Sequence, residues 1–320
     1  MKTKMKTKKI ITFYSAVGGV GRTMALANMS CLLAKETKGK VLMIDWDMTA
    51  PALHEYFKPY IPHYERFLIE KEGLIEYMQM ADKELPEIKP DADEEELLDV
   101  FFTKILDYIV KVDVPNGNDN LYILKAGKFD DDYGDKITNF DWTAFFYKRP
   151  TFFRHLAFYL RKVFDYVLID SKAGTHSDIG GICTMIMPEK LVLVFKPQYK
   201  RSIEMILDLS KRAAYYRQNH SWDDLRPLVI YPLASCVEDT PPNIEWRKKY
   251  IENFEKNHIG IYGFPENTSM EKYFDEVKIQ YVPQYSFGER VAVLEQDVEG
   301  SFQIGYRALL KWFKKSIWEY

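Results

Sequence analysis

The sequence predicts an α/β protein with a doubly wound, mostly parallel sheet flanked by helices. Short runs rich in β-branched and aromatic residues are nearly continuous in apolar character, as strands buried on both faces are. They span residues 10–14, 41–44, 121–124, 166–169, 191–195 and 228–231. Helical patterns, with apolar residues three and four positions apart, lie between them at 23–38, 152–163 and 202–217. Strands that alternate with helices in this way form parallel sheets with both faces covered.

The chain of 320 residues is 47% hydrophobic and can bury a sizeable core. Because no internal repeat or low-complexity linker interrupts it, we expect a single domain over residues 1–320. Residues 58–120, between the second and third predicted strands, break the alternation and carry an acidic cluster between Asp91 and Asp99. We interpret this segment as a mostly helical insertion, in which the acidic residues 93–96 form the solvated first turn of a helix.

Charge and cysteine usage indicate an ordinary soluble protein. The formal net charge is −3, so contact with a nucleic acid or an anionic membrane would need a local basic patch. The cysteines, Cys31, Cys183 and Cys236, are odd in number and lack the spacing of metal ligands. They predict small buried residues in the reducing cytoplasm rather than a disulfide framework.

The N-terminal residues 1–9 include five lysines and precede a short apolar run that ends at Ala16. This run lacks a cleavage-like site and leads directly into a glycine-rich turn, so we interpret it as a buried strand rather than a signal peptide. No stretch approaches the roughly 20 apolar residues that a membrane-spanning helix needs. The lysines are best explained as a solvated, frayed terminus.

The glycine-rich turn from Ala16 to Thr23 joins the first predicted strand to the first predicted helix. The glycines at 18, 19 and 21 allow backbone N–H groups to converge on a phosphate, and the helix N-terminus adds positive potential. Thr23 then stands where its hydroxyl can bind magnesium. The preceding strand, the following helix and the threonine together predict a phosphate-binding loop of the P-loop class.

Three aspartates lie at the ends of predicted strands. Asp45 and Asp47 end the second strand, where the alternation of side chains sends both to the same side. Asp170 ends another apolar strand, shortly before Gly174, which would let the following loop sense a terminal phosphate. The carboxyl ends of parallel strands meet where ligands bind in such folds. We therefore predict that Thr23, Asp45 and Asp170 hold Mg²⁺, and that Asp47 and Asp45 orient the attacking water.

These residues carry a resemblance to a known family. The sequence resembles the MinD/ParA-like (SIMIBI-class) P-loop ATPases, and specifically the bacterial subgroup of KGGVGR-motif variants. The resemblance covers nearly the whole chain. It is carried by residues 18–28, 45–51, 54–57, 127, 130–133, 140–142, 170–174, 178–184 and 281–289.

The resemblance implies a MinD-like fold that binds ATP with Mg²⁺ and forms a face-to-face homodimer around two nucleotides. Switch II corresponds to Ser171, Lys172 and Gly174. Relatives in the subgroup are often fused to or encoded beside effector and repeat domains, so the expected role is control of a partner protein in bacterial signalling or phage defence. The nucleotide-binding residues are Gly18, Gly19, Val20, Gly21, Arg22, Thr23 and Met24.

Two positions depart from the wider family. Val17 stands where the family has a lysine that reaches the partner's ATP, and Arg22 replaces the lysine that touches the β and γ phosphates. Arginine can grip phosphate bidentately, but it is bulkier and differently placed than lysine, so it preserves binding more surely than turnover. We therefore expect tight ATP binding with slow or conditional hydrolysis. Lys172 is a candidate substitute cation, although a solvated loop lysine is the simpler interpretation.

The C-terminal segment 309–320 is basic and amphipathic and resembles the membrane-targeting tail of MinD. Its continuous apolar stripe favours docking on the protein's own core instead. That stripe consists of Phe302, Tyr306, Leu309, Phe313 and Ile317. We favour an ATP-gated dimerising switch. The alternatives are a ParA-type ATPase that cycles on DNA or membrane, for which this tail and the N-terminal lysines are the sequence hints, and a nucleotide-stabilised scaffold without hydrolysis.

Overall fold

The computed structural model describes residues 9–86, 95–115, 120–174, 178–219, 228–238, 240–258, 269–295 and 301–314. Within these residues the strands form an eight-stranded sheet in the order β3-β4-β2-β5-β1-β6-β7-β8. β3 pairs antiparallel with β4, and the other neighbouring strands pair in parallel. The predicted doubly wound, mostly parallel sheet is thus confirmed. The strands are β1 (Lys9–Tyr14), β2 (Val41–Trp46), β3 (Val110–Lys111), β4 (Leu121–Leu124), β5 (Tyr166–Ser171), β6 (Lys190–Phe195), β7 (Val229–Val237) and β8 (Lys278–Gln280).

Helices connect these strands and cover both faces of the sheet. The first part of the chain contains α1 (Arg22–Thr37), η1 (Leu53–Tyr60), α2 (Tyr64–Glu70), α3 (Leu74–Glu84), α4 (Glu95–Phe102), η2 (Thr103–Tyr108), α5 (Tyr133–Asn139), α6 (Trp142–Lys148) and α7 (Phe152–Val163). The second part contains α8 (Asp178–Gly181), η3 (Ile182–Ile186), α9 (Lys200–Asn219), α10 (Pro241–His258), α11 (Met270–Glu276), η4 (Pro283–Ser286), η5 (Ala292–Leu294) and α12 (Ser301–Phe313).

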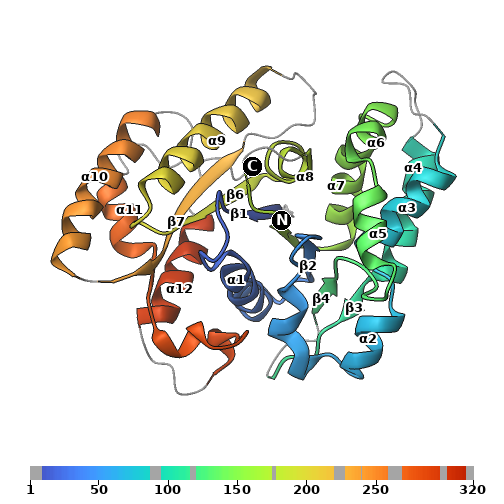
Figure 1. Ribbon diagram of the computed structural model, residues 1–320, viewed down its shortest axis with the longest axis horizontal. Coiled ribbons are helices and arrows are strands. Elements are labelled where there is room, and N and C mark those ends of the chain that lie inside the picture. Colours follow the sequence, from blue (N-terminus) through green and yellow to red (C-terminus); the bar gives the residue numbers. More distant parts are fainter. Residues whose placement is uncertain are drawn as a thin grey trace, which may run out of the picture.

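Alternate side chains of the central strands enter two separate parts of the core. Ile11 and Phe13 of β1 belong to the same core cluster as the buried side chains of α1, whereas Ile10 belongs to the cluster that holds those of α3 and α7. In Figure 1, α1 and α12 lie on one side of the sheet and α7 and α8 on the other. Every residue of β1, β2 and β6 is buried, which explains why these strands are apolar runs without polar alternation.

Within the described residues, the segment 58–120 is largely helical. It contains α2, α3, α4 and η2, and its α4 packs against α7. Side chains of α3 and α4 share the core cluster of Ile10, Leu42 and Ile44, so the segment completes one face of the sheet. Of the acidic residues 93–96, Glu95 begins α4, and residues 93 and 94 lie outside the described residues.

The observed elements differ from the predicted ones mainly at the edges of the sheet. The strand predicted to end at Tyr231 continues to Val237 as β7. The sequence does not predict β3 and β8, because these strands have two and three residues and are too short to show a period-two pattern. The N-terminal residues 1–8, with most of the lysines, lie outside the described residues.

The helix α12 docks on the protein's own core. Tyr306, Leu309 and Phe313 are buried, and the helix contacts α1 and β8. The buried ammonium of Lys190, in β6, donates to the carbonyl of Phe313 at 2.9 Å, so a cation satisfies the C-terminal turn of the helix. The side chain of Phe302 and residues 315–320 lie outside the described part. Among the described residues, none of the helices combines the length and the apolar character needed to cross a bilayer.

Candidate phosphate-binding site

The turn after β1 forms an open loop at the N-terminus of α1. Gly19 and Gly21 have φ angles of 68° and 78°, a region that favours glycine. Gly18 and Gly19 are exposed, and a Cβ atom added to either would meet nothing within 4 Å. In the described chain no backbone N–H of residues 17–21 donates a hydrogen bond to another protein group. The loop therefore presents unpaired donors at the positive end of a helix, the arrangement that binds phosphate.

Packing beneath the loop fixes its position. Val20 is buried, and Met24 packs partly buried against the same core cluster. Gly21 lies close to β7, because a Cβ atom at this position would be 3.1 Å from the hydroxyl of Ser235. The exposed glycines are thus held between a buried anchor and the neighbouring strand.

The first residues of α1 connect the loop to buried acids. The Thr23 hydroxyl donates to Oδ2 of Asp170 at 2.7 Å, which leaves the lone pairs of the hydroxyl oxygen for a cation. The Arg22 guanidinium donates to Oδ1 of Asp170 at 2.5 Å and to Oδ2 of Asp47 at 2.8 Å. Arg22 is 8% exposed. Burial acts to lower the pKa of Arg22, but Asp170 and Asp47 outweigh it and raise the pKa, so the cation is firmly charged.

Asp45 and Asp170 are register neighbours at the carboxyl ends of β2 and β5. Both side chains are almost completely buried. Burial and the nearby charge of Asp170 raise the pKa of Asp45 well above its ordinary value. Burial also raises the pKa of Asp170, against the lowering effect of Arg22. A divalent cation beside these two carboxyls would oppose both shifts and favour their charged forms.

The turn after β2 orients Asp47. The backbone N–H groups of Asp47 and Leu53 donate to the two carboxylate oxygens of Asp45, at 3.2 and 3.1 Å. Thr49 donates its hydroxyl to Oδ1 of Asp47 at 3.2 Å. Asp45 therefore holds the turn in shape, while the Asp47 carboxylate points to Arg22. The alternation of side chains along the strand predicts that Asp45 and Asp47 lie on the same side. It does not predict that Asp45 fixes the turn and that Asp47 pairs with Arg22.

The predicted switch II residues follow Asp170 directly. Ser171 is fully buried, and Lys172 and Gly174 are half-buried. Gly174 has a φ of 108°, its N–H donates to the carbonyl of Ser15 at 3.3 Å, and its carbonyl accepts a hydrogen bond from the Tyr14 hydroxyl at 2.7 Å. The segment is thus tied to the end of β1, beside the loop.

The structure brings together the predicted loop, Thr23, Asp47 and the strand-end acids. Sequence reasoning missed the ion pairs of Arg22, which was expected at the phosphates and here contacts the two carboxylates. It also missed Tyr14, Ser235 and Tyr133. The Tyr133 hydroxyl donates to the carbonyl of Met48, next to Asp47, at 2.8 Å. Tyr133 lies in a segment that carries the family resemblance, which is the signal that could have identified it.

The sequence matches no protein-family model, and no curated protein is significantly similar to it. Solved structures do share its fold. A plasmid partition protein of Borrelia burgdorferi bound to AMPPNP is 17% identical with a TM-score of 0.59, over 97% of this chain and 99% of that chain. MinD of Pyrococcus horikoshii complexed with Mg-ADP is 17% identical with a TM-score of 0.54, over 95% of each chain. A ParA family ATPase of Chlorobium tepidum is 14% identical with a TM-score of 0.53, over 95% and 98%. The chain has the MinD/ParA fold.

Proposed function

We propose that the chain binds ATP and Mg²⁺ at the loop from Ala16 to Thr23 and acts as a nucleotide-dependent switch. The observation that carries this proposal is the set of unpaired N–H donors in residues 17–21, at the N-terminus of α1 and beside the Thr23–Asp170 hydrogen bond. The nucleotides named for the solved structures of the same fold, AMPPNP and Mg-ADP, support the same ligand class.

The residues of the site divide into binding and activating groups. The loop 18–24 would hold the phosphates, and the Thr23 hydroxyl would bind Mg²⁺ directly. Asp170 and Asp45 would hold the ion through water, as buried carboxylates near a hydrated Mg²⁺ do. The bound ion would neutralise charge on the phosphates. Asp47, on the turn after β2, would orient the attacking water.

Slow or conditional hydrolysis is expected from the cations available. Val17 provides no charge at the start of the loop, and the Arg22 guanidinium is engaged by Asp170 and Asp47. An arginine that neutralises two carboxylates is not free to stabilise charge on a transferring phosphoryl group without breaking those pairs. Hydrolysis at an ordinary rate that Asp47→Ala leaves unchanged would contradict this part of the proposal.

The switch would operate as a homodimer that forms around two nucleotides and acts on a partner protein in bacterial signalling or phage defence. The exposed faces of Gly18 and Gly19 support such an arrangement, because a second chain can approach the loop there. Size-exclusion chromatography with light scattering, with and without ATP and Mg²⁺, tests it. We expect a monomer without nucleotide and a dimer with it. A monomer under both conditions contradicts the dimeric switch.

A further inference from the structure

The segment that follows β4 packs unusually closely, although the proposed function gives it no role. A Cβ atom on Gly127 would be 2.5 Å from Cγ2 of Ile75 and 2.7 Å from Cε2 of Tyr133, and real Cβ atoms essentially never come this close to another atom. Gly73, at the start of α3, is equally confined, with the carbonyl oxygen of Lys125 only 2.5 Å from its Cβ position. The end of β4, the start of α3 and the ring of Tyr133 therefore fit one another closely.

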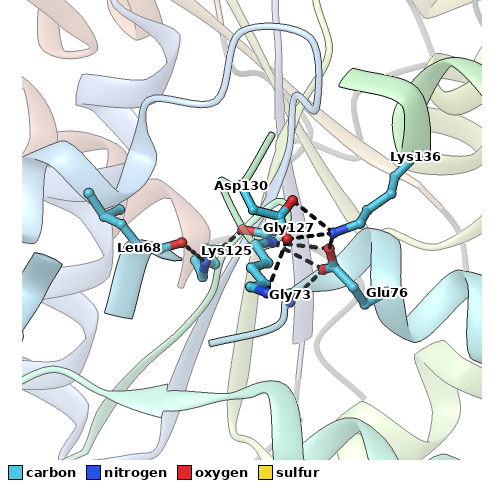
Figure 2. A network of polar contacts seen from close by, with 8 residues as sticks. Leu68, Gly73, Glu76, Lys125, Gly127, Asp130 and Lys136 are labelled. Atoms are coloured by element: carbon cyan, nitrogen blue, oxygen red, sulfur yellow. Dashed lines mark hydrogen bonds and ion pairs between the residues drawn. The ribbon is translucent and has the colours of Figure 1, made fainter. Parts of the chain in front are cut away.

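Backbone hydrogen bonds join α3 to the end of β4. The N–H groups of Leu74 and Ile75 donate to the carbonyls of Lys125 and Ala126, each at 2.9 Å. The Lys125 ammonium is fully buried and donates to the carbonyls of Leu68 and Gly127 at 2.8 and 2.7 Å. The end of β4 is thus a fixed junction between α2, α3 and the strand (Figure 2).

A charged cluster fixes α5 to the same junction. The carboxylate of Glu76, on α3, accepts from the backbone N–H of Gly73 and pairs with the Lys136 ammonium at 3.1 Å. Lys136, on α5, also pairs with Asp130 at 3.0 Å. Figure 2 shows the Lys136 ammonium beside the carboxylates of Glu76 and Asp130. These contacts set the position of the helix that begins with Tyr133.

Tyr133 connects this rigid assembly to the turn that carries Asp47. Its hydroxyl donates to the carbonyl of Met48 at 2.8 Å. The same turn is closed by the N–H of Ala50, which donates to the carbonyl of Asp47 at 3.2 Å. Burial and the nearby carboxylates of Asp45, Glu76 and Asp47 raise the pKa of Tyr133, so the phenol keeps the proton that it donates.

We propose that Tyr133 is a positioning residue that fixes the turn 47–50, and with it the direction of the Asp47 carboxylate, from the junction of β4, α3 and α5. The role in catalysis rests on the proposed function, in which Asp47 orients the attacking water. The mechanical link from Tyr133 to the turn does not depend on it. Loss of the hydroxyl would let the turn move while the loop 16–23 keeps its own packing.

The first test is amide hydrogen exchange in the ligand-free protein, comparing wild type with Tyr133→Phe. Loss of one hydrogen bond should accelerate exchange in peptides that contain the amides of Asp47, Ala50 and Leu53 about fivefold. Peptides from β6 should exchange at the wild-type rate. Tyr147→Phe is the matched control, because Tyr147 lies on α6 and is 77% exposed. Wild-type exchange of the turn in Tyr133→Phe overturns the inference.

The second test separates ATP affinity from turnover. In single-turnover assays Tyr133→Phe should lower the hydrolysis rate about tenfold and leave the ATP dissociation constant within about twofold, because only the direction of Asp47 changes. Lys136→Met, which releases α5 from Glu76 and Asp130, should likewise accelerate exchange in the turn 47–50 and lower the hydrolysis rate, with ATP affinity unchanged. A loss of ATP affinity with an unchanged hydrolysis rate overturns the positioning role. If wild type does not bind ATP, the proposed function fails, and the exchange experiment alone decides the link.

Discussion

Replacing Arg22 by methionine removes the cation between two buried carboxylates. Arg22 is 8% exposed, Asp170 1% and Asp47 6%, so water cannot replace the lost contacts without opening the site. Breaking a buried ion pair by removing one partner costs about 3–5 kcal/mol, because the remaining charge is left uncompensated. We expect Arg22→Met to lower the free energy of unfolding of the ligand-free protein by an amount in this range at pH 7.

The free energy of unfolding that is lost in Arg22→Met should depend on pH. Burial already raises the pKa of Asp170, and the removal of Arg22 takes away the charge that opposes this shift. The carboxyl group of Asp170 therefore takes up a proton more readily in Arg22→Met than in wild type. Because the protonated form avoids the cost of a buried negative charge, the destabilisation by Arg22→Met should be smaller at pH 5 than at pH 7.

Urea unfolding followed by fluorescence at both pH values measures these differences. Arg66→Met is the control, because Arg66 pairs with Glu70 on the surface of α2 and should not change the stability measurably. A double-mutant cycle with Asp170→Asn then isolates the coupling between Arg22 and Asp170. If Arg22→Met is as stable as wild type at pH 7, the ion pairs of Arg22 with Asp47 and Asp170 do not stabilise the fold.

Two further predictions concern the rest of the fold. Lys190→Met removes the ammonium that donates to the carbonyl of Phe313. The variant should be less stable than wild type by about 2–3 kcal/mol in urea unfolding, with ATP affinity unchanged. If its stability equals that of wild type, Lys190 does not fix α12. Burial lowers the pKa of His54 to about 4. The imidazole of the unfolded chain therefore takes up a proton near pH 6.5, whereas that of the folded chain stays neutral until about pH 4. The free energy of unfolding should fall as the pH drops from 6.5 to 4. His54→Phe should remove this loss, about 2.5 kcal/mol at pH 4.5, and an identical pH dependence of wild type and variant would refute the assignment.

The parts of the fold that the sequence predicts are those whose patterns are local. The apolar runs that became β1, β2 and β6 are buried along their whole length, so composition alone marks them. The proximity of Asp45 and Asp170 also follows from the sequence, because the carboxyl ends of parallel strands meet. Lys190 is different: it precedes an apolar run, and only tertiary structure shows that it binds the end of α12.

In the candidate site, too, the sequence predicts the local features and not the contacts between distant residues. The glycine turn and Thr23 are recognisable because strand, turn and helix are consecutive in the chain. The contacts of Arg22 with Asp47 and Asp170 span 25 and 148 positions, and no spacing rule predicts which of several nearby groups a long side chain will choose. Tyr133 lies 85 positions from Met48, and its contact depends on the close packing at Gly127.

Calorimetric titration of ATP, with and without Mg²⁺, into wild type and Thr23→Val tests whether the loop 16–23 binds ATP together with the ion. Valine keeps the shape of threonine but lacks the hydroxyl that donates to Asp170 and would bind the ion. We predict that wild type binds ATP more tightly with Mg²⁺ than without it, and that Thr23→Val binds ATP equally under both conditions. Absence of ATP binding to wild type would contradict ATP binding at this loop, and an unchanged effect of Mg²⁺ in Thr23→Val would contradict the role of the Thr23 hydroxyl.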